Sequence, residues 1–337
     1  MMLVRPVATS DHAELLTLAQ EAGIGFTSLP ADPDVLEKKI QRSVASFALA
    51  PGGEREKRFL FVLQDTKTGK LVGSAGIVTH VGLSHPFYSY KLSTIVQASN
   101  NLGIYSLQRV LHMVNDYTDA TEIGSLFVMP DYRRDGIGRF LSRSRYLMMA
   151  EFPDLFSDVV ISEIRGVQDD NGESPFYQNL ARNFFQMDFK RADFINATQG
   201  GQFISDLMPK YPIYVNLLDE KAQAVIAQPL EASRPAMNLL EREGFRNQGY
   251  VDVFDAGPTM EAERARIRTV RKSKHATVKD IIANIDGTLH IISNTTITDF
   301  RMAYASTQEA GEGVILSAAT AEELRVKKGD PIRFVEM

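Results

Sequence analysis

The amino-acid sequence predicts an α/β fold, because segments typical of strands and of helices alternate along it. Residues 123–128 are apolar and β-favouring, Pro130 ends this run, and apolar residues then recur at helical spacing over 137–148. A hairpin pattern spans 59–78, and a strand followed by a helix is predicted within 2–18. The chain therefore combines a strand-loop-helix unit with antiparallel strands.

The N-terminal elements follow in order. Residues 2–6 favour a strand, and Asp11 precedes apolar positions of helical spacing, so a capped helix is expected there. Residues 59–63 and 71–78 favour two strands, with Gly69 at the turn between them. These elements come before the motif strand at 123–128.

The turn between this strand and the next helix is rich in arginine and glycine. The first amides of a helix lack intrahelical partners, and the helix dipole places partial positive charge there. Gly136 and Gly138 would let a pyrophosphate approach this bare backbone. The cationic side chains nearby are Arg133, Arg134, Arg139, Arg143 and Arg145. A phosphate site is one interpretation, and a solvated basic helix face is the alternative.

Later segments continue the alternation of elements. A β-rich run places Glu163 and Arg165 on one face of a strand. Helical periodicity within 234–245 ends at Gly244, a plausible C-cap, and a strand is predicted within 249–255.

From residue 264 the chain is first basic and then rich in short β-favouring runs. Residues 264–274 are basic, which is typical of a solvated helix face. Short β-favouring runs separated by Gly and Asp turns follow from 289 to 337. A small β-rich C-terminal unit is therefore expected.

Composition limits the class of protein. The chain has 337 residues, 44% of them hydrophobic and 23% charged, so it is long enough for two core-bearing units. A net charge of -5 argues against a general nucleic-acid binder. The absence of cysteine excludes disulfides, thiolate catalysis and Cys-ligated zinc, and it fits a reducing cytoplasm.

Neither a membrane segment nor a metal site is expected. No apolar stretch of about 18 residues and no signal-peptide pattern occurs, so a soluble cytoplasmic protein is predicted. The histidines are scattered and none has metal-ligand spacing. They are His12, His80, His85, His112, His275 and His290.

The pattern Arg133-x-x-Gly136-x-Gly138, after a strand that ends in Val-x-Pro, resembles the acyl-coenzyme A motif of the GNAT superfamily of N-acetyltransferases. A nucleotide P-loop would have Gly-Lys-Ser/Thr, which is missing here, and the context of a dinucleotide fold is also missing. The text from Phe176 to Phe189 is similar to the closing helix and strand of that superfamily. The resemblance implies a GNAT-type N-acyltransferase fold.

Over most of its length, the sequence resembles the arginine N-succinyltransferase family. The segments that carry this resemblance are Gly25-Phe-Thr-Ser-Leu-Pro-Ala, the pair Phe59 and Phe61, Gly172-Glu-Ser-Pro-Phe, Arg182-Asn-Phe-Phe-Gln-Met-Asp-Phe, Ala192-Asp-Phe, Asp206-Leu-Met-Pro-Lys, Tyr211-Pro-Ile-Tyr and Asp255-Ala-Gly-Pro-Thr. They run in order from near the N-terminus to about residue 275.

The resemblance implies a division of the chain into three parts. Residues 1–195 would form an acyl-CoA-binding half, and 196–265 a second, degenerate acyltransferase-like half. Residues 266–337 would be the β-rich unit. No second arginine-glycine turn occurs within the second half.

The family activity implied is transfer of a succinyl group from succinyl-CoA to the α-amino group of L-arginine, giving N2-succinylarginine and CoA. Succinyl-CoA is then a substrate, and no permanently bound cofactor or metal is expected. The resemblance assigns Leu126 to the succinyl-CoA contact and Val128 to pairing with the pantetheine arm. The CoA-binding set is Leu126, Val128, Arg133, Arg134, Gly136 and Gly138.

The family's proton-donor histidine corresponds to Leu230, which cannot transfer a proton. Tyr177 is a substitute acid by its resemblance to the tyrosine that protonates thiolate in many acyltransferases, or else a packing residue. Glu163 is a candidate either to assist deprotonation of the amine or to hold the guanidinium of arginine, and Arg165 is a candidate for binding the succinyl carboxylate. Alternatively, these two side chains pair with each other as a structural link.

Three functions remain open on the sequence alone. The first is arginine succinylation, the second is acylation of ornithine or another amine, and the third is a noncatalytic CoA-binding subunit that has lost the acid at Leu230. A homodimer or a paralogous subunit is a family-level expectation. Nucleic acid and membrane partners are not expected.

Overall fold

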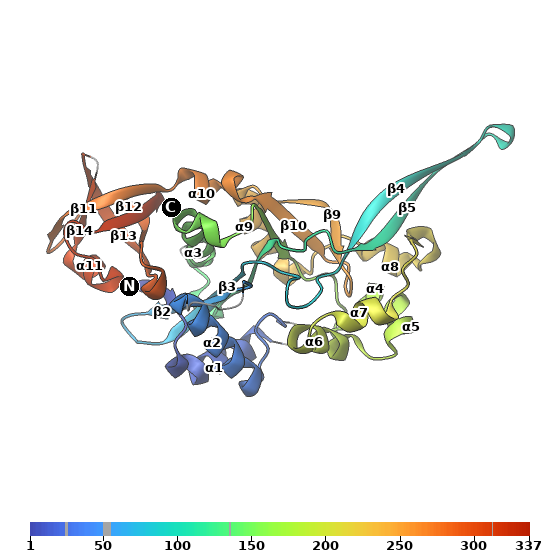
Figure 1. The fold of residues 1–337 in the computed structure, drawn as a ribbon, viewed down its shortest axis with the longest axis horizontal. Coiled ribbons are helices and arrows are strands. Elements are labelled where there is room, and N and C mark those ends of the chain that lie inside the picture. Colours follow the sequence, from blue (N-terminus) through green and yellow to red (C-terminus); the bar gives the residue numbers. More distant parts are fainter. Residues whose placement is uncertain (24–25, 50–54, 135, 312) are drawn as a thin grey trace. The chain divides into compact units, whose positions relative to one another are not determined.

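The computed structural model describes residues 1–23, 26–49, 55–134, 136–311 and 313–337; Gly25 of the first family segment lies outside them. The chain splits into two compact units, each built from separate stretches of sequence (Figure 1). Unit 1 comprises Met1–Thr79, Ile123–Asp158 and Glu263–Met337. Unit 2 comprises His80–Glu122 and Val159–Ala262. The three-part division expected from the sequence stays a prediction.

Unit 1 contains the predicted strand at the N-terminus and the predicted hairpin. Its strands lie in the order β12, β15, β11, β14, β13, β1, β2, β3, β6. Their bounds are Met2–Pro6 (β1), Arg58–Asp65 (β2), Leu71–Val78 (β3), Thr121–Val128 (β6, which begins in unit 2), Lys274–Ile282 (β11), Thr288–Asn294 (β12), Met302–Ala310 (β13), Gly313–Ser317 (β14) and Pro331–Glu336 (β15). The hairpin is antiparallel, with Phe61 opposite Ala75.

The C-terminal strands of unit 1 close on themselves. Besides β15, β12 also pairs with β13, so β11 to β15 form a five-stranded ring. Its interior holds Val278, Ile292, Leu316, Ile332 and Phe334. The β-rich C-terminal segment expected from the sequence is therefore a small closed barrel.

The helices of unit 1 cover its strands with apolar faces. They are His12–Ala22 (α1), Pro33–Ala48 (α2), Ile137–Glu151 (α3), Arg268–Lys272 (α10) and Ala318–Leu324 (α11). Leu15 and Leu18 of α1 and Leu36 and Ile40 of α2 share one core cluster with Leu60 of β2. Asp32 caps α2 by accepting a hydrogen bond from the Val35 amide.

Unit 2 has strands in the order β7, β10, β9, β4, β5, β8, with the first residues of β6 beside β7. The strands are Ser89–Ser99 (β4), Ile104–Val114 (β5), Val159–Glu163 (β7), Ile213–Tyr214 (β8), Arg246–Asp252 (β9) and Pro258–Glu263 (β10). The helices are Pro175–Asn179 (α4), Arg182–Phe185 (α5), Phe189–Gln199 (α6), Gln202–Leu207 (α7), Glu220–Val225 (α8) and Arg234–Glu243 (α9). The predicted α/β class is confirmed.

Two element predictions in unit 2 have different outcomes. The helix ending at Gly244 is confirmed as α9, with Gly244 at φ 105°. The expected closing strand between Phe184 and Phe189 is wrong, because α5 ends at Gln186 in a left-handed conformation and Asp188 then caps α6. Local capping therefore makes this segment helical.

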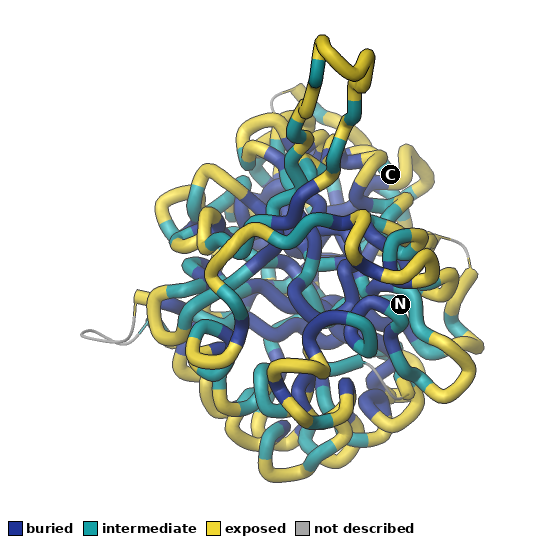
Figure 2. Tube along the Cα trace, turned by 90° about the vertical axis from the view of Figure 1, so that its right-hand side faces the viewer, coloured by how far each residue is buried: buried dark blue, intermediate teal, exposed yellow. Residues whose placement is uncertain are grey.

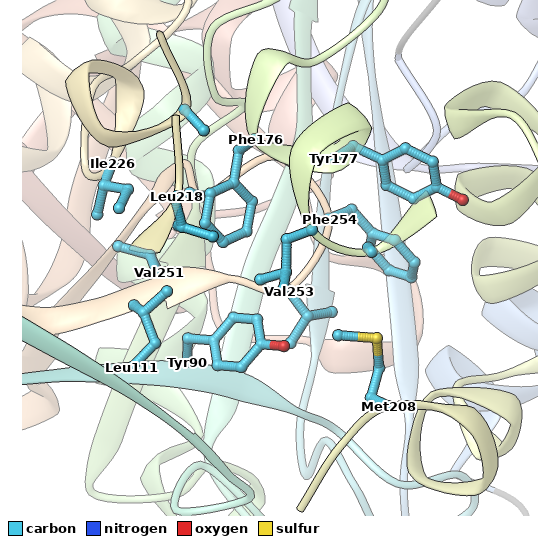
Figure 3. Close-up of a cluster of buried hydrophobic side chains, with 14 of the residues drawn as sticks. Tyr90, Leu111, Phe176, Tyr177, Met208, Leu218, Ile226, Val251, Val253 and Phe254 are labelled. Atoms are coloured by element: carbon cyan, nitrogen blue, oxygen red, sulfur yellow. The ribbon is translucent and has the colours of Figure 1, made fainter. Parts of the chain in front are cut away.

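The core of unit 2 is strongly aromatic. Tyr90, Phe176, Tyr177, Val251 and Phe254 belong to one buried cluster, and Figure 3 shows their side chains converging from β4, α4, β9 and the turn after it. None of the helices in the described part of the chain is long and apolar enough to cross a membrane.

Candidate functional site

The arginine- and glycine-rich turn joins β6 to α3 in unit 1. Pro130 begins a short 3-10 helix, Pro130–Tyr132, directly after the strand. Gly136 is the N-cap residue of α3 and has φ 75°, a left-handed conformation that favours glycine. A Cβ atom added there would lie 2.8 Å from Met337 Cε. The observed turn therefore depends on glycine at position 136.

Gly138 lies in the first turn of α3, where backbone amides have no acceptor inside the helix. A Cβ atom added at Gly138 would have no heavy atom of the described residues within 4 Å. The space beside this amide is therefore open, as approach of a pyrophosphate requires. Binding of pyrophosphate by Gly136 and Gly138 stays a prediction.

Arg133, in the turn before α3, contacts the end of β6. Arg133 Nε donates to the Val128 carbonyl oxygen over 2.9 Å, and its guanidinium lies 5.4 Å from the centre of the Phe127 ring. This side chain thus ties the turn to the end of β6. Arg133 and Arg134 are both exposed.

Arg143 and Arg145 are buried within unit 1. Arg143 Nη1 donates to the Glu336 carbonyl oxygen over 2.8 Å, which joins α3 to β15. Arg145 donates to Ser142 and lies over the Tyr146 ring. These two arginines are therefore not part of a solvated helix face, and their contribution to the charge near the turn stays a prediction.

Strand β6 has an irregular centre. Ser125 has φ 51°, and its carbonyl oxygen accepts a hydrogen bond from Ser74 Oγ over 2.8 Å. Pairing with β7 covers only Thr121 and Glu122, so within the described residues Leu126 has no β7 partner. Leu126 is partly buried and Val128 is buried. A free backbone edge at this strand is what pairing with a pantetheine arm requires, and that pairing stays a prediction.

In unit 2, Arg165 lies just after β7 and is held by two carboxylates. Its Nη2 lies 2.8 Å from Asp193 Oδ2 and its Nη1 lies 3.3 Å from Asp255 Oδ2. Burial alone would lower the pKa of Arg165, but Asp193 and Asp255 outweigh it and raise the pKa. The cation is fixed, and these contacts do not include the predicted pairing with Glu163.

Glu163 ends β7 and is partly buried among other acids. Burial raises its pKa well above the ordinary range, and Asp252, Glu122 and Asp255 raise it further, while Arg165 opposes them. No side-chain hydrogen bond to the Glu163 carboxylate occurs in the described part of the chain. Glu163 is therefore poised to accept a proton or to receive a cation.

Asp252, at the end of β9, is the neighbouring charge with the largest effect on the pKa of Glu163. Its Oδ1 accepts hydrogen bonds from the amides of Phe254 and Asp255 over 2.7 and 2.8 Å. Burial and the charge of Asp255 nevertheless raise the pKa of Asp252 to about 8. We call Glu122, Glu163, Asp193, Asp252 and Asp255 the acidic cluster. The charge of Arg165 lowers the pKa values of Glu163 and Asp252, but burial and the neighbouring carboxylates outweigh it.

Two glycines let the segments of this cluster cross closely. A Cβ atom at Gly166 would lie 2.4 Å from the Asp255 carbonyl oxygen. One at Gly257 would lie 2.0 Å from the Ile164 carbonyl oxygen. Only glycine allows this crossing, which sets Asp255 against Arg165.

Leu230, at the position of the family histidine, lies next to the backbone of Arg165. The Leu230 amide donates to the Arg165 carbonyl oxygen over 2.8 Å, and Pro229 pairs with Gly166. Leu230 is partly buried. The chain thus keeps the position beside Arg165, although leucine has no proton to transfer.

Tyr177 is fully buried in the aromatic core of unit 2 (Figure 3). Its hydroxyl donates to the Met187 carbonyl oxygen over 3.2 Å, and its ring stacks 6.4 Å from that of Phe254. Burial, followed by the charge of Asp188, raises its pKa. These contacts fit the packing alternative, and the role of proton donor stays a prediction.

Sequence reasoning missed Asp193 and Asp252 as members of the site. Asp193 and Asp255 stood in two of the family segments, Ala192-Asp-Phe and Asp255-Ala-Gly-Pro-Thr, but separation in sequence hid their meeting at Arg165. Within the described stretches, no group of three or more His, Cys, Asp and Glu side chains could hold a metal ion.

Known proteins match this chain over nearly its whole length. A model of the family described as arginine N-succinyltransferase beta subunit matches residues 2–269, and a model of its C-terminal domain matches residues 274–336. The chain belongs to the arginine N-succinyltransferase family. It is therefore an acyltransferase, as the sequence predicted.

Relatives match the whole length of the chain. The arginine N-succinyltransferase of Escherichia coli O139:H28 is 42% identical over all of this chain and 98% of its own length. The Shigella flexneri protein has the same identity and coverage. The solved structure of arginine/ornithine succinyltransferase subunit AI from Pseudomonas aeruginosa has a TM-score of 0.89 at 36% identity, covering 100% of this chain and 98% of that one.

Proposed function

We propose that this acyltransferase moves a succinyl group from succinyl-CoA to the α-amino group of L-arginine, releasing N2-succinylarginine and CoA. In this proposal unit 1 binds the CoA moiety and unit 2 binds the cationic amino acid. Succinyl-CoA is a substrate, no cofactor is held permanently, and the reaction takes place in the cytoplasm.

The gathering of carboxylates in the acidic cluster is the observation that carries the proposal. Arg165 contacts Asp193 and Asp255, and although its charge also lowers the pKa values of Glu163 and Asp252, both values stay raised. Partly buried carboxylates are costly unless they are protonated or paired. A substrate with a guanidinium and an ammonium group supplies positive charge to pair with them. The name of the Pseudomonas relative, which includes arginine and ornithine, is consistent with this substrate class.

Glu163 has the properties of a general base. Its raised pKa makes the carboxylate a better proton acceptor from an ammonium group than an ordinary glutamate. The neutral amine then attacks the thioester carbonyl carbon, and the C–S bond breaks as the amide forms. Arg165 is assigned to the succinyl carboxylate, in competition with its contacts to Asp193 and Asp255.

The departing thiolate needs a proton, and Leu230 cannot provide one. A thiol of ordinary pKa, about 8.5, can leave as thiolate at modest cost, and general acid catalysis adds typically about 10²–10⁴-fold. Tyr177 is one source of the proton. A second chain is another, since the family description and the Pseudomonas relative both carry the word subunit.

The test is direct turnover by the full chain. Arginine and succinyl-CoA are incubated with the protein while free thiol and the mass of the acylated product are followed, with ornithine and acetyl-CoA as paired controls. Succinylarginine formed faster than succinylornithine or acetylarginine supports the proposal. Faster succinylation of ornithine shows that the amine assignment is wrong.

A second candidate function rests on Leu230. If the missing proton donor has abolished catalysis, the chain is a CoA-binding subunit of an enzyme whose other chain performs the transfer. This candidate predicts CoA binding by the turn at Gly136 and Gly138 without turnover on any amine. Turnover restored by a homologous chain that carries the histidine would identify it.

A further inference from the structure

Strands β4 and β5 form a ribbon that extends beyond the remaining strands of unit 2 (Figure 1). They pair with each other along their whole length, from Ser89 opposite Val114 to Ser99 opposite Ile104. By contrast, β9 pairs with β4 only over Ser89 to Lys91, and β8 pairs with β5 only at Val110 and Leu111. In the described part of the chain, residues 92–109 therefore have no strand partner outside the ribbon. We call 92–109 the distal ribbon.

One face of the distal ribbon is apolar. Residues directly opposite each other in an antiparallel pair share a face, and the register sets Val96 opposite Leu107 and Ala98 opposite Tyr105. Val96, Leu107 and Tyr105 are 54%, 61% and 68% exposed, and Figure 2 shows the exposed end of the ribbon. Such a cluster of exposed apolar side chains marks an interaction surface.

The same face leads into the core of unit 2. Thr94 and Arg109 are the next opposed pair on it, and beyond them Tyr90 and Leu111 lie on the same side of the strands and are fully buried. The opposite face of the distal ribbon carries Gln97, Ser106 and Gln108, with an isoleucine at each end. The ribbon is therefore amphipathic, with the core-forming pattern extended into solvent.

Charge identifies the kind of partner. Residues 92–108 contain no Asp, Glu, Lys, Arg or His, although 23% of the chain is charged, and the charged side chain of the distal ribbon is Arg109 at its base. Nucleic acids, anionic lipids and charged peptides are recognised through charge, so this surface suits none of them. It does suit a copy of itself, because a two-fold axis brings the same neutral apolar stripe onto itself without like charges meeting.

The length of the ribbon supports the same partner. Each copy carries a net charge of -5, so contact between two bodies would bring like charges together. Antiparallel stacking of two distal ribbons separates the bodies by roughly 25 Å, at about 3.4 Å per residue. This exceeds the Debye length of about 8 Å at physiological salt, so the repulsion is screened.

We propose that the apolar face of the distal ribbon, formed by Val96, Ala98, Tyr105 and Leu107, docks onto the same face of a second copy of this chain. A two-stranded ribbon is marginally stable alone in water, and pairing with its copy covers the apolar side chains. This surface is independent of the proposed substrate.

The test compares two neighbouring positions on opposite faces of β5. Sedimentation equilibrium of the full wild-type chain should give twice the chain mass of 37.5 kDa. Leu107→Glu places a charge in the docked face and should raise the dimer dissociation constant about 100-fold or more. Gln108→Glu adds the same charge to the other face and should leave the dimer intact. Tyr105→Ser is a milder second variant and should weaken the dimer without adding charge.

Each outcome decides the proposal. All variants should keep the wild-type melting temperature, because these side chains lie outside the buried core. A wild-type chain of single mass, a Leu107→Glu dimer as tight as the wild type, or equal loss of the dimer with Gln108→Glu would each overturn it. A chain that assembles only with a homologous partner would also overturn it, because the proposed partner is a second copy.

Discussion

The turn of unit 1 and the acidic cluster of unit 2 solve opposite binding problems. The turn offers backbone amides at the start of α3, with Arg133 and Arg134 exposed beside them, so it suits an anion. The cluster offers carboxylates of raised pKa around Glu163 and Asp252, so it suits a cation. Under the proposed function, the turn would bind the anionic donor and the acidic cluster the cationic acceptor.

The two regions also differ in how they are encoded. The turn is one continuous stretch whose conformation depends on Gly136. The cluster is assembled from four separate stretches of the chain, through the crossing of Gly166 and Gly257 and the ion pair between Arg165 and Asp193. Substitutions in one region should therefore leave ligand binding by the other unchanged.

The largest expected effect is at the base. Glu163→Gln removes the proton acceptor and should lower kcat for arginine by about 10²–10⁴-fold, since general base catalysis contributes on that scale. Calorimetry should find the CoA dissociation constant unchanged. Glu241→Gln, the same change at an exposed position of α9, is the matched control and should retain activity. Activity of Glu163→Gln equal to that of the control would exclude Glu163 as the base.

A gain of function is expected at Leu230. Leu230→His places an imidazole beside Arg165 and should raise kcat by up to about 10²-fold, because it supplies the missing general acid. Leu230→Asn is the control, since it is polar but has no proton to transfer near neutral pH. Equal kcat values for both variants would mean that position 230 does not reach the leaving group.

A smaller effect is expected at the turn. Gly138→Ala fits the protein, because a Cβ atom there meets no described atom within 4 Å, but it occupies the space assigned to pyrophosphate. The CoA dissociation constant should rise about tenfold, and Gly138→Asp should raise it further through charge repulsion. Melting temperature and the KM for arginine should stay unchanged. Unaltered CoA affinity in both variants would remove Gly138 from the site.

The two regions should respond differently to pH. Asp252 has a pKa of about 8 in the fold against an ordinary 3.8. Because the folded pKa is raised, its contribution to stability is complete below the ordinary pKa and is lost as pH rises toward 8. Asp252→Asn does not titrate, so its melting temperature relative to wild type should rise between pH 5 and pH 8.

Asp280→Asn is the control for this prediction, because the pKa of Asp280 is shifted in the opposite direction to that of Asp252. The pKa of Asp280 is lowered, chiefly by its hydrogen bond from Lys328, so its contribution is present above the ordinary pKa. Asp280→Asn should not gain stability relative to wild type at pH 8. A flat melting-temperature difference for Asp252→Asn across this range would show that Asp252 is an ordinary carboxylate.

The smallest effect is expected at Tyr177. Tyr177→Phe removes a hydroxyl that donates to the Met187 carbonyl oxygen, so stability should fall by about 1 kcal/mol. kcat should change by less than about threefold, because the buried hydroxyl holds its proton through its raised pKa. A loss of kcat near 10²-fold, measured at matched stability, would assign Tyr177 as the acid.

The sequence predicted the elements whose signals are local. The strand at β6, the helix α3 and the C-cap at Gly244 all follow from periodicity and glycine placement over neighbouring residues. The strand expected before Phe189 rested on the resemblance to the superfamily's closing helix and strand, and it is wrong because Asp188 caps a helix there. Local caps decided this element.

The acidic cluster could be predicted only in part. Glu163 and Arg165 were found through their alternation along a strand, but the partners of Arg165 lie 28 and 90 residues further along the chain, at Asp193 and Asp255. Such contacts depend on tertiary packing that periodicity does not encode. The burial of Arg143 and Arg145 was hidden for the same reason, since an arginine pattern alone does not distinguish a solvated face from a buried one.

The most direct test of the central claim is a calorimetric titration of the full chain with L-arginine and with L-citrulline, its neutral isostere. Arginine should bind at least about tenfold more tightly than citrulline, because the acidic cluster attracts a cation. Asp252→Asn should reduce this difference in dissociation constant. Equal affinity for the two amino acids would contradict the assignment of unit 2 as a site for a cationic substrate.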